Sequence, residues 1–146
     1  MILLDTSALI EYYRPSGDAA VRSTVAEAIA ADLAAVNGII QVEMLAFASG
    51  EEERRLLEDD FEAFHHLDLS RKQFDRACEL GFALRRRGVT VPATDLIIAA
   101  SAILSQAEIL HVDGHFDRIA EISDLRSRHL GRAPSTSDDS TLPLDT

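Results

Sequence analysis

The stretch that decides the fold lies at the N-terminus and reads Ile2-Leu3-Leu4-Asp5-Thr6-Ser7. Three consecutive apolar residues predict a short strand that is buried on both faces, as in a parallel sheet covered by helices. Asp5, Thr6 and Ser7 are residue types that cap helices, so a helix is predicted from about Ala8. A buried strand that ends at an acid and leads directly into a helix indicates an α/β domain.

Alternating strand and helix patterns continue along the chain. Strands are predicted at 33–36, 66–69 and 108–112, and helices at 18–32, 39–49, 51–64, 70–87 and 94–106. This order favours right-handed crossovers and a mostly parallel sheet of four or five strands with helices on both faces, a three-layer α/β/α sandwich. The helix at 39–49 is apolar except at Gln41 and Glu43, so it is expected to be buried almost all round.

The length of 146 residues fits one domain, which we assign to residues 1–131. Residues 132–146 are rich in Ser, Thr, Pro and Asp and are expected to form a disordered acidic tail. The single cysteine, Cys78, excludes an internal disulfide and is interpreted as a small core residue. The N-terminus lacks a basic segment, and no apolar run reaches the roughly 18 residues of a membrane span, so we expect a cytoplasmic protein.

Four acids each lie within an apolar segment: Asp5 after the first strand, Glu43 within a helix, Asp95 near a helix start and Asp113 after the last strand. Burying an ionised carboxylate is costly unless a cation compensates it. The chain has one lysine, and its arginines lie in polar stretches away from these acids. If the four acids converge, a hard divalent cation is the natural counter-ion, and oxygen ligands favour Mg²⁺ or Mn²⁺ over Zn²⁺.

Each acid also has a purely structural interpretation. Asp5 could cap the first helix, Asp95 could complement a helix dipole, and Asp113 could begin an Asp-Gly turn. Glu43 fits such an interpretation least, because it lies in mid-helix among apolar residues; its structural alternative is a buried ion pair with an arginine. The coincidence of four favours a metal site. The net charge of −11 is unusual for a protein that binds nucleic acid, but two divalent cations would supply up to about +4 at the site.

Four segments together resemble a known family. They are residues 4–10 (LDTSALI), 42–45 (VEML), 92–100 (PATDLIIAA) and 111–119 (HVDGHFDRI). Their order and spacing resemble PIN-domain ribonucleases, specifically the VapC toxins of bacterial VapBC toxin-antitoxin modules. The similarity covers roughly residues 1–122. The chain departs from the family at Asn37 and Gly38, where a hydroxyl residue is common.

The resemblance implies a toxin that cleaves RNA as a Mg²⁺- or Mn²⁺-dependent endoribonuclease, with Asp5, Glu43, Asp95 and Asp113 as metal ligands. It also implies a homodimer and a cognate VapB-type antitoxin that covers or disrupts the site. Asp117 is a further candidate ligand. Three hydroxyl residues lie beside the proposed ligands and could either hydrogen-bond to them or cap helices: Thr6, Ser7 and Thr94.

The expected reaction is attack of a metal-activated water on an RNA phosphodiester. Other functions were weighed against it. A phosphotransferase with an aspartyl nucleophile is disfavoured because Asp5 is followed by Thr6-Ser7 rather than by a second acid. This chain also has no lysine at a strand end, which disfavours both the phosphotransferase and a receiver domain. A catalytically silent binding module and a DNA nuclease of the same fold remain open.

Overall fold

The computed structural model describes residues 1–131; the tail expected at 132–146 lies outside the described residues. Within this part the chain forms five strands and seven helices, which confirms the predicted α/β class. In chain order they are β1 (Ile2–Leu4), α1 (Thr6–Tyr13), α2 (Ala19–Ala30), β2 (Ala34–Val36), α3 (Gly38–Leu45), α4 (Glu51–Ala63), β3 (His65–His66), α5 (Arg71–Arg86), α6 (Ala93–Ser105), β4 (Glu108–His111), α7 (Gly114–Ala120) and β5 (Arg126–His129).

All strand pairs are parallel, and the strand order is β3-β2-β1-β4-β5. β1 lies at the centre, where Leu3 pairs with Ala35 of β2 on one side and with Ile109 of β4 on the other. The chain first builds the sheet outward from β1 in one direction and then returns to place β4 on the opposite side. The carboxyl ends of β1 and β4 therefore meet at the point where the strand order reverses, the usual position of a site in such sheets.

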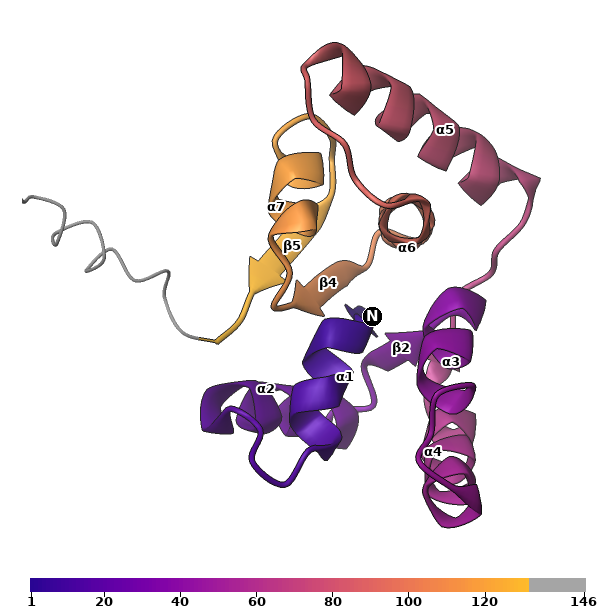
Figure 1. The fold of residues 1–146 in the computed structure, drawn as a ribbon, viewed down its shortest axis with the longest axis vertical. Coiled ribbons are helices and arrows are strands. Elements are labelled where there is room, and N and C mark those ends of the chain that lie inside the picture. The colour runs from indigo at the N-terminus through magenta and orange to yellow at the C-terminus, as the bar shows by residue number, and fades with distance from the viewer. Residues whose placement is uncertain (132–146) are drawn as a thin grey trace, which may run out of the picture.

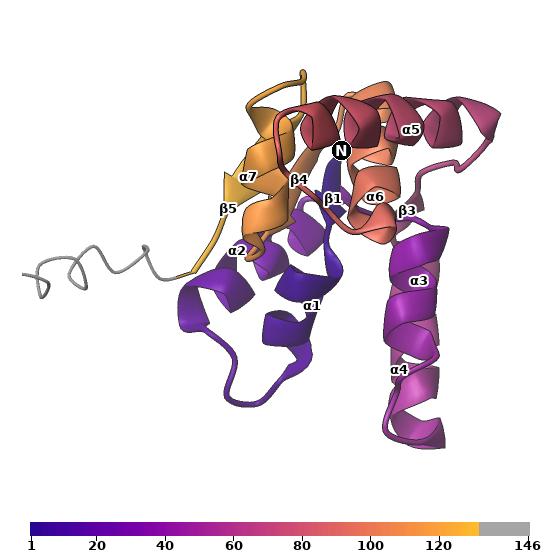
Figure 2. The ribbon, with the colours of Figure 1, turned by 45° about the horizontal axis from the view of Figure 1, so that its top comes forward.

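Helices cover both faces of the sheet. In two views α1 and α2 lie on one side of the strands and α5 and α6 on the other, while α3 and α4 extend beyond the β2 edge (Figures 1 and 2). Between these layers Leu3, Leu4, Ile109 and Leu110 are fully buried. α5 lies close against α6, because a Cβ on Gly81 would be only 2.8 Å from Cδ1 of Leu96.

Two burial predictions were wrong. α3 ends at Leu45 and is not buried all round. Val42 within the helix is 61% exposed, and Phe47, two residues beyond its end, is 81% exposed. This helix lies at the edge of the molecule, and Ile40 is its one fully buried residue. Cys78 is exposed rather than a core residue, because the opposite face of α5 packs inward.

The sheet also differs from the predicted strands at its two edges. β3 is confined to His65–His66, and β5 at Arg126–His129 was not among the individual strands predicted. β5 is polar because only one of its sides pairs, with β4, and its residues are largely exposed. Among residues 1–131, no helix combines the length and apolar character that crossing a membrane requires.

Candidate active site

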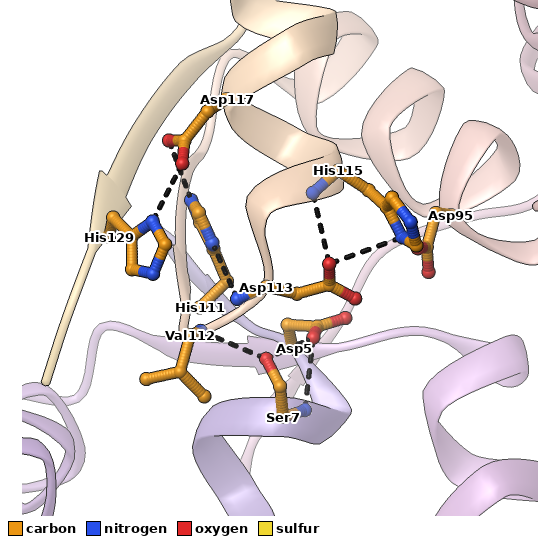
Figure 3. A network of polar contacts seen from close by, with 9 residues as sticks. All are labelled: Asp5, Ser7, Asp95, His111, Val112, Asp113, His115, Asp117 and His129. Atoms are coloured by element: carbon orange, nitrogen blue, oxygen red, sulfur yellow. Dashed lines mark hydrogen bonds and ion pairs between the residues drawn. The ribbon is translucent and has the colours of Figure 1, made fainter. Parts of the chain in front are cut away.

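The four acids singled out in the sequence come together at the carboxyl edge of the sheet. Asp5 follows β1 and caps α1, and Asp113 follows β4 and caps α7. Asp95 lies in the first turn of α6, and Glu43 lies in the middle of α3. Three of them, Asp5, Asp95 and Asp113, approach one another in Figure 3. Asp5 is close enough to Asp95 and Glu43 for their negative charges to affect its ionisation.

Asp5 is the most buried member, with 4% of its surface exposed. Its Oδ2 accepts hydrogen bonds from the backbone N–H of Ser7 at 2.9 Å and from Oγ–H of Ser7 at 2.5 Å. Burial raises the pKa of Asp5 from its ordinary value of 3.8 to about 6; the Ser7 hydrogen bonds oppose this rise, and the charges of Asp95 and Glu43 add to it. The sequence therefore places a carboxylate where its charge is costly without a cation.

The other three acids are each held by a neighbouring donor. Thr6 donates from Oγ1 to Oε1 of Glu43 at 2.6 Å. The Nδ1 atom of His115 lies 2.8 Å from Oδ2 of Asp95 and 3.1 Å from Oδ1 of Asp113, and the backbone N–H of His115 donates to the same Asp113 oxygen at 2.9 Å. Burial raises the pKa of Asp95, the hydrogen bond from His115 lowers it, and the charge of Asp113 raises it.

One feature is common to all four carboxylates. In each, one oxygen is hydrogen-bonded to a protein donor and the other makes no hydrogen bond within residues 1–131. The bonded atoms are Oδ2 of Asp5, Oε1 of Glu43, Oδ2 of Asp95 and Oδ1 of Asp113. The structural and functional interpretations of Asp5 and Asp113 are therefore compatible, because capping a helix uses only one of their two oxygens. Four oriented carboxylates with a remaining oxygen each are suited to a divalent cation.

The remaining sequence candidates differ in position. Ser7 donates to Asp5 and also accepts from the backbone N–H of Val112 at 3.0 Å, so it ties the start of α1 to the loop after β4. Thr94 is exposed, and its side chain makes no hydrogen bond to a described residue. Asp117 lies apart from the four acids, where its Oδ2 is 2.6 Å from Nδ1 of His129 (Figure 3).

Two histidines on either side of Asp113 also contact the acids of the site. His115 bridges Asp95 and Asp113, and His111, fully buried, accepts the backbone N–H of Asp113 at Nδ1 at 3.2 Å. Burial lowers the pKa of His111, which favours the neutral ring. Their positions on either side of Asp113 were visible in the sequence, but no pattern indicated which acid each would contact.

The Thr6 hydroxyl gives a first testable prediction. Thr6→Val keeps the shape of the side chain but removes the donor to Glu43, so the protein is expected to bind Mn²⁺ about tenfold more weakly, as when other partners of metal ligands are removed. Calorimetric titration with Mn²⁺ measures this effect. Thr24→Val is the matched control, because Thr24 donates only to the backbone oxygen of Ala20 on an exposed face of α2. Equal binding by both variants would contradict the prediction.

A parallel α/β/α sandwich with converging carboxylates at its strand ends is typical of a metal-binding α/β domain. The family model described as "PIN domain" matches residues 2–122. VapC ribonuclease Mb1587 of Mycobacterium bovis is 36% identical over 132 residues, covering 87% of this chain and 97% of that protein. Ribonuclease VapC18 of Mycobacterium tuberculosis is 30% identical over 124 residues, covering 82% and 88%.

Solved structures give the same fold. VapBC from Salmonella typhimurium bound to DNA matches with a TM-score of 0.68 at 17% identity, covering 88% of this chain and 96% of the other. VapBC2 from Rickettsia felis bound to a promoter DNA fragment matches with a TM-score of 0.67 at 19% identity, covering 88% and 98%. The chain thus belongs to the PIN-domain family and, within it, to the VapC ribonucleases. PIN-domain nucleases use divalent metal ions, and this chain has acidic and histidine groups able to hold one.

Proposed function

We propose that this protein is the toxin of a toxin-antitoxin module and acts in the cytoplasm as a Mg²⁺- or Mn²⁺-dependent endoribonuclease. The proposal rests mainly on the four carboxylates that meet where the strand order reverses, each with one oxygen hydrogen-bonded and the other left for a metal. The curated relatives of this chain are VapC ribonucleases. The nuclease domain spans residues 1–131 in this proposal.

In the proposed mechanism Asp5, Glu43, Asp95 and Asp113 hold the metal. When bound, the metal supplies an activated water and neutralises charge on the attacked phosphate. Thr6, Ser7 and His115 fix one oxygen of each carboxylate, so the ligands need little rearrangement before the reaction. No side chain of the protein needs to act as the nucleophile.

Because the site is negatively charged, we expect substrate binding to require the metal. Residues 1–131 place four acids where a phosphodiester would approach, and a polyanion would be repelled by them. The raised pKa values of Asp5 and Asp95 show that this part of the protein already disfavours negative charge. A divalent cation reverses the local sign, so RNA binding and metal binding are expected to be coupled.

A VapB-type antitoxin is the proposed partner, since several structural neighbours are complexes of the VapBC type. A cleft of about 820 Å³ lies along α1, α3 and α4; its lining includes Ile10, Tyr13, Met44, Leu56 and Leu57. Met44 directly follows Glu43, so a segment in this cleft would lie beside the site. The net charge of −11 favours a basic partner.

A homodimer belongs to the same proposal. Several large apolar side chains are exposed in the single chain, and association with the antitoxin or with a second copy would cover them. They are Val42, Phe47, Phe74 and Phe82.

The proposal is tested by incubating the purified chain, freed of any partner, with cellular RNA in Mg²⁺, Mn²⁺ or EDTA. Discrete cleavage is expected with either metal, none in EDTA, and none for Asp95→Asn. Asp124→Asn is the matched control, because this exposed acid is remote from the site and should leave cleavage unchanged. Cleavage that persists in EDTA or in Asp95→Asn would contradict the proposal.

The same assay separates the alternatives. A DNA nuclease would cut a DNA of matched sequence in preference to the RNA. A silent binding module, whose carboxylates hold a structural metal or only cap helices, would cleave neither substrate under any of these conditions.

A further inference from the structure

A second group of polar side chains lies behind Asp113. It consists of His111 at the end of β4, Asp117 on α7 and His129 at the end of β5 (Figure 3). Asp117 pairs through Oδ2 with Nδ1 of His129 at 2.6 Å, and its Oδ1 lies 3.8 Å from Nε2 of His111. The cluster reaches the site through His111, whose Nδ1 accepts the backbone N–H of Asp113.

The hydrogen bond from Asp113 determines which nitrogen of His111 carries the proton. Because Nδ1 accepts an N–H, it has no proton of its own, so the neutral ring is protonated at Nε2. Nε2 is fully buried and has no hydrogen-bond partner among the described residues. Within residues 1–131, the acidic group paired with Nε2 is Asp117, which is held in place by His129 on the other side.

Two imidazoles and a carboxylate could suggest a Zn²⁺ site, and the three donor atoms lie within 4.8 Å of one another. The tautomer argues against it. A metal on Nε2 of His111 would move the proton to Nδ1, where it would face the N–H of Asp113 at a nitrogen separation of 3.2 Å. The buried ring is therefore better suited to orient the loop than to bind a metal.

The loop after β4 is fixed at two successive amides. Ser7 accepts the N–H of Val112, and His111 accepts the N–H of Asp113. Ser7 also donates to Asp5, so it links the loop that carries Asp113 to the Asp5 carboxylate. A ligand displaced by a fraction of an ångström binds its metal less well, so such fixing has functional value.

We propose that His111 and Asp117 are positioning residues for Asp113. Asp117, anchored by His129, attracts the Nε2–H of His111 and so keeps Nδ1 available to accept the Asp113 amide. This inference rests on the proposed function, in which Asp113 is a metal ligand. It assigns Asp117 a role behind the site in place of direct ligation.

The test measures Mn²⁺ affinity by calorimetry together with the melting temperature. Asp117→Ala is expected to weaken Mn²⁺ binding about tenfold, with little change in melting temperature because the Asp117 side chain is 45% exposed. Glu121→Gln is the matched control. Glu121 is exposed, lies four residues after Asp117, and its side chain makes no hydrogen bond or ion pair with a described residue. This variant should bind Mn²⁺ as the unmodified protein does.

A pair of variants at His111 separates positioning from packing. His111→Asn keeps an acceptor near the position of Nδ1, whereas His111→Gln keeps a donor near the position of Nε2. Both variants lose the ring, so they are expected to lose a similar amount of folding stability. Only His111→Asn is expected to retain most of the Mn²⁺ affinity. Long-range ¹⁵N NMR of the unmodified protein should show His111 protonated at Nε2.

Several results would overturn the inference: unchanged Mn²⁺ affinity in Asp117→Ala, an equal loss in Glu121→Gln, equal affinities for the two His111 variants, or a proton on Nδ1. Tight Zn²⁺ binding that His129→Ala removes would overturn it as well. Failure of the proposed function looks different. In that case the unmodified protein cleaves no RNA, while the ordering of Mn²⁺ affinities among the variants still holds.

Discussion

Replacing Asp5 with Asn is expected to abolish RNA cleavage and, at the same time, to raise the melting temperature of the metal-free protein. Losing a ligand that stabilises the transition state through the metal costs several kcal/mol, or about 10³-fold in rate. The gain in stability has a separate cause, because Asp5 is buried and its pKa lies near 6. Asparagine caps a helix nearly as well and carries no charge.

The stability effect should depend on pH. Below about pH 4 the Asp5 carboxyl is protonated in both the folded and the unfolded chain, so it costs nothing. As the pH rises from 3.8 to about 6, the unfolded chain releases the proton while the folded chain retains it, and the free energy of unfolding falls. Above that range the cost stays constant at about 3 kcal/mol, the equivalent of a shift of about two pKa units.

Thermal unfolding in EDTA at pH 4 and pH 7.5 measures this difference. Asp5→Asn should melt higher than the unmodified protein at pH 7.5 and close to it at pH 4. Added Mg²⁺ should stabilise the unmodified protein and have little effect on the variant. Asp18→Asn is the matched control, because Asp18 caps α2 through the N–H of Val21 and is not one of the four acids of the site. A variant that melts lower than the unmodified protein at pH 7.5 would contradict the argument.

Leu110→Ala is expected to destabilise the domain by about 2 to 5 kcal/mol. Leu110 is fully buried in β4, pairs in register with Leu4, and accepts the backbone N–H of Asp5 through its own carbonyl oxygen at 3.1 Å. Truncating it removes apolar contacts at the centre of the sheet and leaves a cavity directly beneath the site. Cleavage should therefore weaken as stability falls.

Urea unfolding followed by circular dichroism measures the loss. Leu104→Ala makes the same exchange at a residue of α6 that is 43% exposed, and it should change the free energy of unfolding by less than about 1 kcal/mol. Similar losses for the two variants would show that the centre of the sheet is less tightly packed than the structure indicates.

Local patterns in the sequence were sufficient for the centre of the fold. The apolar run at residues 2–4 followed by Asp5 predicted β1, its burial and the acid at its end, because strand burial and helix capping depend on adjacent residues. The same holds for Asp113 after β4. The position of four acids within apolar segments, with few cations nearby, predicted which carboxylates come together at the candidate site, although only Asp5 of the four is buried.

Features that depend on the neighbours of an element were missed. β5 is a strand because it pairs with the open edge of β4. Its residues are polar and show no alternation with apolar residues, so the sequence pattern did not predict it. The apolar sequence of α3 predicted burial, yet its position at the edge of the molecule leaves Val42 exposed. Cys78 is exposed for a similar reason, since the rotation of α5 is set by its packing on α6.

The sequence by itself determined the α/β class, the central strand and the identity of the four acids, because these follow from periodicity, capping and the cost of burying charge. Only the tertiary structure decided which oxygen of each acid is hydrogen-bonded, that His115 bridges Asp95 and Asp113, and that Asp117 lies with His111 behind the site. Contacts of this kind join segments far apart in the sequence; Ser7 and Val112, which share a hydrogen bond, are 105 residues apart. Their geometry depends on how the layers pack, which no local pattern encodes.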